Sequence, residues 1–212
     1  ALTNLERKAT TDDLVVFYFT GNGLSGSDTY PYDETDGKDE YLAPYDGSAT
    51  SAYANIRDDE LKDWCNRVPA KHFLLILDAG VSGGMTKFAP TESVTANGKT
   101  ISSIIASQDE EFQDGLDEDF RKDLSGGKYL VLMACDASES CGFHKYYSNS
   151  AFTYYIVQGL KTSSADINRN SWISAEEAFT YAKPLARTYS QVVQNAQIYD
   201  GSSGQQVEMN HY

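Results

Sequence analysis

Two short, glycine-rich segments contain the residues of this chain that are best placed to take part in chemistry. Residues 20–23 read TGNG and residues 78–84 read DAGVSGG, and each segment follows an apolar run. Ligands collect at the carboxyl ends of strands in open α/β sheets, so such segments are typical of an active site. Nucleophilic catalysis there needs a thiol or hydroxyl with a base beside it. Ser82 is the one nucleophile at the apex of the second segment, and none of the three histidines is placed to serve it as a base.

The elements that position these segments are predicted to be buried strands. Residues 73–77 (FLLIL) are apolar without interruption, which suits a strand that is buried on both faces of a sheet. Residues 14–19 and 129–134 predict two more strands of this kind. The apolar spacing predicts helices at 2–9, 56–68, 109–123, 151–160 and 175–187, the last bent or ended near Pro184. Residues 23–46 and 89–108 are predicted to be loops.

Together the two segments resemble the motifs of the caspase-like cysteine peptidases, the group that includes metacaspases and bacterial caspase homologues. One family strand ends in S/T-G-H-G, whose His is the general base, and the next ends in D-x-C-x-S-G, whose Cys is the nucleophile. Here Asn22 stands in place of the His and Gly80 in place of the Cys. The resemblance implies a mostly parallel sheet with helices on both faces, formed by residues 1–201 and closed by a strand at 197–200.

The resemblance also implies that the family's first two strands are missing from this sequence, because residues 14–19 match the third. A second chain that supplies those strands is therefore a predicted partner, since an uncovered strand edge favours aggregation. Residues 202–212 are predicted to be a polar, frayed tail.

An Asn amide is not a base near neutral pH and Gly has no side chain, so we predict a catalytically inactive domain. The resemblance implies a retained cleft for a peptide or protein ligand with basic residues, lined by Asp78, Asp36, Asp39, Cys135 and Asp136. For Asp78, a purely structural role at the strand end stays open. The alternative function is an endopeptidase that cleaves after Arg or Lys and whose catalytic pair was deliberately replaced.

The chain has three cysteines, which are too few for a disulfide scaffold. Cys65 falls on the apolar face of a predicted helix and is predicted to lie in the core. Cys135 and Cys141 are predicted to be reduced thiols rather than a disulfide, and the cellular compartment is left undecided.

Residues 166–177 (DINRNSWISAEE) follow the spacing of an EF-hand calcium loop. The predicted metal ligands are Asp166, Asn168, Asn170, Trp172 and Glu177. Ser171 stands where the motif has Gly, and only two of the ligand side chains are carboxylates. A helix start with a capping box from Ser174 to Glu177 explains the same residues and is the favoured interpretation. A calcium-responsive binding module is thus a further alternative, although no cofactor is required by the first hypothesis.

Composition excludes several classes of protein. The 212 residues are 41% hydrophobic and 12% aromatic, which indicates a folded domain with its own core. The net charge of −14 argues against nucleic acid as a partner and fits basic peptides or cations. No apolar run approaches the ~18 residues of a membrane-spanning helix, so no membrane partner is predicted.

Overall fold

A mixed sheet of six strands lies at the centre of the chain, in the order β3-β2-β1-β4-β7-β9. The structure is a computed structural model that describes residues 2–32, 37–47, 54–81, 94–96, 99–101, 128–136, 139–201 and 206–212. The three central strands run parallel: β1 (Leu14–Ser27), β4 (His72–Val81) and β7 (Tyr129–Met133). The outer strands run antiparallel to their neighbours: β2 (Lys38–Ala43), β3 (Ile56–Arg57) and β9 (Gln197–Asp200). The predicted α/β fold is confirmed.

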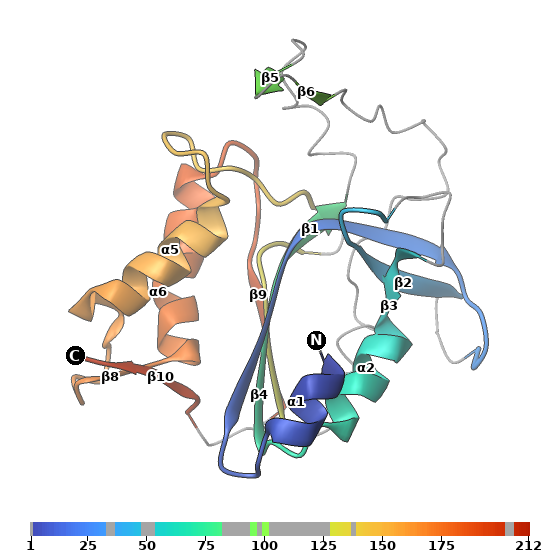
Figure 1. Cartoon of the computed structure of the whole chain (residues 1–212). Coiled ribbons are helices and arrows are strands. Elements are labelled where there is room, and N and C mark those ends of the chain that lie inside the picture. Colours follow the sequence, from blue (N-terminus) through green and yellow to red (C-terminus); the bar gives the residue numbers. More distant parts are fainter. Residues whose placement is uncertain are drawn as a thin grey trace.

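Helices cover both faces of this sheet, as Figure 1 shows. One face carries α1 (Leu2–Lys8) and α2 (Asp58–Arg67), and the other carries α5 (Ala151–Lys161) and α6 (Ala175–Tyr189). The side chains of β4 alternate between the two cores. Phe73, Leu75 and Leu77 lie in the core beside α1 and α2, whereas Leu74 and Ile76 lie in the core beside α5 and α6. An apolar run without polar alternation is the expected sequence of such a doubly covered strand.

The two glycine-rich segments are extended. The predicted turn at residues 78–84 is wrong for residues 78–81, and residues 82–84 lie outside the described residues. Residues 20–23 pair in register with residues 78–81, so both strands continue past their apolar runs. The predicted loop at 23–46 is wrong for residues 24–27 and 38–43, which form the β1–β2 hairpin. Small residues without bulky side chains let the backbones approach, and hydrogen bonding across the pair keeps them extended.

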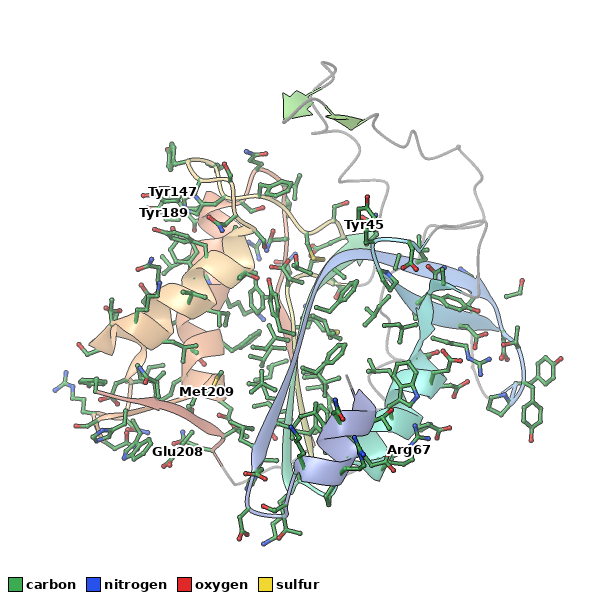
Figure 2. All side chains as sticks on the ribbon, in the orientation of Figure 1. Tyr45, Arg67, Tyr147, Tyr189, Glu208 and Met209 are labelled. Atoms are coloured by element: carbon green, nitrogen blue, oxygen red, sulfur yellow. A yellow bond between two sulfur atoms is a disulfide. The ribbon has the colours of Figure 1, made fainter. Side chains whose placement is uncertain are left out.

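Two expectations at the C-terminal end are also corrected. Helix α6 continues through Pro184 to Tyr189, because buried Ala182 and Ala186 hold both halves of the helix against the core. The prediction of a frayed tail is wrong for residues 206–212. Strand β10 (Glu208–His211) pairs with β8 (Trp172–Ser174), and Val207 is buried. Met209, labelled in Figure 2, packs against the core beside α5 and α6.

Strand β1 has an unpaired edge along its first half. Strand β2 pairs with β1 only from Asn22 onward, and no other strand of the described ranges pairs with residues 14–21 on that side. Val16 and Tyr18 are 45% and 46% exposed there.

The remaining described elements are a small hairpin and a short helical turn: β5 (Val94–Ala96), β6 (Lys99–Ile101) and the 3-10 helix η3 (Ser163–Ala165). The predicted helix at 109–123 and most of the predicted loop at 89–108 lie outside the described residues. No helix in the described ranges is long and apolar enough to cross a bilayer.

Candidate functional site

Asn22 and Gly80 face each other across the two central strands. They are register partners in the parallel β1–β4 pair. Neighbouring strands lie about 4.8 Å apart, and the side chains of paired residues point to the same face of the sheet. The structure therefore brings together the two positions that sequence analysis singled out. Neither residue supplies chemistry, because an amide does not accept a proton near neutral pH and Gly80 has no side chain.

The space beside Gly80 is filled by a disulfide loop. Cys135 and Cys141 form a disulfide, with their Cα atoms 5.5 Å apart, so the prediction of two reduced thiols is wrong. A Cβ atom at position 80 would lie 2.5 Å from the Cys141 backbone nitrogen and 2.9 Å from Cys135 Sγ. Real Cβ atoms do not approach other atoms so closely, so the loop has its present place only because residue 80 is glycine.

Two side chains clamp this loop. Gln194 is fully buried, accepts from the Gly142 amide at 2.8 Å and donates to the Ala134 carbonyl at 3.2 Å. The Glu139 carboxylate accepts from the backbone amide of Asn195 at 2.6 Å and from that of Asp136 at 3.2 Å. Because buried polar groups need partners, these contacts fix the loop over the strand ends. Cys135 is 4% exposed and Asp136 is half-buried, so of these two predicted ligand-binding residues only Asp136 reaches the surface.

Asp78 is buried beneath the start of helix α5. It is 3% exposed, and its carboxylate accepts a hydrogen bond from Thr153 Oγ1 in the first turn of that helix. Tyr18 Oη lies 3.0 Å from the same Thr153 hydroxyl. Burial raises the pKa of Asp78 above its ordinary value, and hydrogen bonding from Thr153 opposes that shift. These contacts favour the structural role for Asp78 over direct contact with a ligand.

We expect Asp78→Asn to stabilise the protein, relative to wild type, more at pH 7 than at pH 4. The pKa of Asp78 is raised in the folded state, so its protonated form favours folding. The wild type therefore loses stability as the pH rises from the unfolded pKa (about 3.9) through the folded pKa, by about 1.4 kcal/mol per pKa unit. Asn does not titrate and escapes this loss. Urea unfolding of both proteins at the two pH values measures the difference, and a larger benefit at pH 4 would contradict it.

The comparisons with known proteins agree with this architecture. Residues 1–89 match the family model described as metacaspase, peptidase C14 domain. This match covers less than half of the chain, and together with the mixed sheet it supports a caspase-like fold. The crystal structure of protein GSU0716 from Geobacter sulfurreducens aligns with a TM-score of 0.52 and 17% identity, covering 93% of this chain and 71% of that one. At that identity the likeness concerns the fold alone. No curated protein matches the chain significantly.

Asp39 lies at the turn end of the β1–β2 hairpin. It pairs with Gly26, whereas Asp78 pairs with Thr20. At ~3.3 Å per residue, the two places are roughly 20 Å apart along β1, so the structure does not bring these carboxylates together. Asp36, the third predicted ligand-binding carboxylate, lies outside the described residues.

Asp39 instead belongs to an acidic cluster that sequence analysis missed. Asp39, Asp58 and Asp59 offer carboxylate oxygens that lie within 4.8 Å of one another. Such oxygens are suited to a divalent cation. Arg57 already places positive charge there, with its guanidinium 3.6 Å from Asp39 and 3.3 Å from Asp59. Burial, and next the charge of Asp39, raise the pKa of Tyr41 to about 12, so Tyr41 stays a neutral donor to Asp39. The only sign of this cluster in the sequence is the run RDDE at residues 57–60. Its acidic residues are also explained by the helix dipole, because they lie in the first turn of α2.

None of the histidines can serve as a base at the Asn22–Gly80 position. His144 is 2% exposed, its Nε2 lies 3.0 Å from Tyr155 Oη, and its Nδ1 accepts from the Tyr146 amide at 3.1 Å. Burial lowers the pKa of His144. His72 is at the opposite end of β4 from Gly80, and His211 packs against Trp172 in the β8–β10 pair. The rings of Tyr147 and Tyr189, both labelled in Figure 2, contact the His144 ring, an aromatic cluster that the sequence did not suggest.

The predicted calcium residues lie together in the loop that leads into α6. The capping box is present, since Ser174 Oγ accepts from the Glu177 amide at 3.2 Å and Glu177 accepts from the Ser174 amide at 3.0 Å. The favoured interpretation of this segment as a capped helix start is therefore confirmed. A calcium loop also has a helix cap at its ninth residue, here Ser174, and a carboxylate at its twelfth, here Glu177. The two interpretations are therefore compatible.

Proposed function

We propose that this caspase-like domain has no peptidase activity and acts as a binding or regulatory module for peptide or protein ligands. The observation that carries the proposal is the state of the site at the strand ends. Asn22 and Gly80 occupy the paired positions, and the disulfide loop fills the space that a nucleophilic side chain would need. Cysteine peptidase chemistry requires a thiolate and a partner that accepts and returns a proton.

The ligand surface we propose is the end of the sheet around Asn22. Asn22 pairs with Ala43, so the segment that follows β2 lies beside it. Tyr45 is fully exposed, and Figure 2 shows it above this end of the sheet; Asp46 next to it is also exposed. With the net charge of −14, an exposed carboxylate beside an exposed aromatic ring favours peptides that contain Arg or Lys.

Peptide assays test both parts of this proposal. Fluorogenic peptides with Arg, Lys or Asp before the reporter are expected to show no turnover above buffer. A labelled Arg-containing peptide is expected to bind, and Asp46→Asn is expected to weaken it about threefold, equivalent to roughly 0.7 kcal/mol for one exposed charge. Tyr45→Ala is also expected to weaken binding of this peptide. Tyr30→Ala removes an exposed tyrosine at the other end of the hairpin and is the control, with no expected effect on binding. Turnover of any peptide would overturn the inactivity, and equal binding of acidic and basic peptides would overturn the binding preference.

The unpaired edge of β1 supports a proposal about protein partners. Residues 14–21 present backbone groups that no described strand pairs on that side, beside the half-exposed Val16 and Tyr18. Such an edge can accept a further strand. We propose that a second chain adds a strand at this edge.

Native mass spectrometry tests the proposed strand addition. We expect an assembly heavier than 23.4 kDa that separates under denaturing conditions, and we expect Val16→Lys to abolish it. Val157→Lys, at an exposed position of α5, is the matched control. A species of 23.4 kDa alone would contradict this proposal.

A further inference from the structure

The loop from Asp166 to Glu177 has inward-turned oxygen side chains at regular spacing. Asn170 N donates to Asp166 Oδ1 at 3.2 Å and to Asn168 Oδ1 at 3.0 Å. Trp172 N donates to Asn170 Oδ1 at 2.8 Å. Each side chain is thereby held over the loop by an amide further along the chain. These are positions 1, 3 and 5 of a twelve-residue loop, from which calcium receives its first three side-chain ligands.

The backbone of this loop makes the sharp turn that the motif requires, although it lacks the usual glycine. Ser171 stands at position 6 and has φ 70°, and Arg169 at position 4 has φ 60°. Both residues lie in the left-handed region that favours glycine. The fold therefore accommodates Ser171 at the position where the calcium motif has Gly. Positions 7 to 12 of such a loop are a short strand and the start of a helix, and here they are β8 and the capped start of α6.

Two buried carboxylates belong to this loop. Asp166 is 9% exposed and Glu177 is 5% exposed. Glu177 Oε1 accepts from the amides of Ile167 and Asn168, each at 3.1 Å, so the carboxylate reaches back across the loop. Tyr212 Oη donates to Asp166. This hydrogen bond, then burial and the charges of both carboxylates, raise the pKa of Tyr212.

No Lys or Arg of the described ranges forms an ion pair with either carboxylate, in contrast to the Arg57-paired Asp39 cluster. Both carboxylates accept hydrogen bonds from neutral donors, which are backbone amides and, for Asp166, the Tyr212 hydroxyl. Two carboxylates in one loop without a cationic side chain of the described residues paired to them are an observation separate from the spacing of the motif. A divalent cation would balance their charge.

We propose that residues 166–177 bind one Ca²⁺ ion. The ligands are the side chains of Asp166, Asn168 and Asn170, the backbone carbonyl of Trp172 and the carboxylate of Glu177. Such a set of oxygens suits Ca²⁺ rather than Mg²⁺, which demands a smaller octahedral shell and keeps its water. With only two carboxylates, the dissociation constant belongs in the weak range of about 10⁻⁴–10⁻³ M. The proposal does not depend on the absence of peptidase activity.

Titration of the full chain with Ca²⁺ alone, by calorimetry and tryptophan fluorescence, tests the site. Trp172 reports from within the loop, where its ring lies 4.5 Å from that of His211. We expect one site per chain, and we expect Glu177→Gln to weaken binding at least about tenfold because one bidentate ligand is lost. Gln keeps the capping box, so the helix start is preserved. Glu176→Gln makes the same charge change one residue away and is expected to leave Ca²⁺ affinity unchanged.

A gain-of-affinity variant keeps the test decisive if loss variants fold poorly. Asn170→Asp adds a third carboxylate and is expected to tighten Ca²⁺ binding about three- to tenfold. No heat and no fluorescence change up to about 10 mM Ca²⁺ in either wild type or Asn170→Asp would overturn the proposal. Binding that Glu177→Gln leaves intact and Asp59→Asn abolishes would overturn it as well, because the ion would then lie in the Asp39 cluster.

Discussion

Gly80→Ala is expected to lower the free energy of unfolding by about 2–4 kcal/mol, which is large for the addition of one methyl group. The added Cβ would lie 2.5 Å from the Cys141 backbone nitrogen, 2.9 Å from Cys135 Sγ and 3.1 Å from Cys141 Sγ. A flexible side chain could move aside, but a backbone nitrogen in a loop closed by a disulfide and clamped by Gln194 cannot do so cheaply. Urea unfolding of wild type and variant, monitored by circular dichroism, measures the loss.

Gly23→Ala is the matched control for this effect. Gly23 lies one residue beyond Asn22 in β1, and a Cβ there would meet its nearest atom, the Gly80 carbonyl oxygen, at 3.6 Å. That is ordinary van der Waals contact, so we expect a change of less than about 1 kcal/mol. Equal losses for the two variants would show that the disulfide loop does not occupy the space beside Gly80.

Removing the disulfide relieves the clash if the loop is its cause. Cys135→Ala with Cys141→Ala is expected to reduce stability by about 2 kcal/mol, the value for closing a loop of this short length. In that background Gly80→Ala is expected to lose clearly less than in the wild type, because the loop can move away. The difference between the two losses is the coupling energy between residue 80 and the loop.

The sequence predicted the strands better than their ends. Apolar runs such as residues 73–77 have one natural place in an α/β sheet, so their burial and order followed from local pattern. Residues 20–23 and 78–81 contain turn-forming types, yet they are extended because each segment is the other's partner. That pairing is a property of two segments far apart in the chain, which neither segment reveals alone.

The sequence predicted which residues occupy the site, but not the contacts that surround them. The resemblance placed Asn22 and Gly80 at the ends of two strands, and the structure pairs these two residues. The role of Asp78, in contrast, depends on Thr153, far along the chain at the start of α5. The residues next to the disulfide are likewise held from far along the chain, because Gln194 accepts from the Gly142 amide and donates to the Ala134 carbonyl. Long-range hydrogen bonds of this kind leave no periodic signal in a single sequence.

Asn22→His combined with Gly80→Cys is expected to show no cleavage while the Cys135–Cys141 disulfide is present. The new thiol would be forced against two sulfur atoms and a backbone amide, where it has no room to receive a substrate carbonyl and can exchange with the disulfide. Adding Cys135→Ala and Cys141→Ala frees that space. The introduced imidazole and thiol would then stand at register-paired positions on one face of the sheet, within reach of a hydrogen bond.

The fourfold variant is therefore expected to cleave after Arg about 100-fold faster than the wild-type background, the scale of a positioned base acting on a thiol. Hydrolysis of Arg, Lys and Asp reporter peptides by wild type, the twofold variant and the fourfold variant measures this, with iodoacetamide confirming the thiol. Full activity of the twofold variant alone would favour a peptidase whose catalytic pair was deliberately replaced, because a working site would then need only its two missing side chains. Activity that appears only without the disulfide would mean that the disulfide loop blocks the space beside residue 80. The blocked site would then be a property of the fold and not the result of two missing side chains alone.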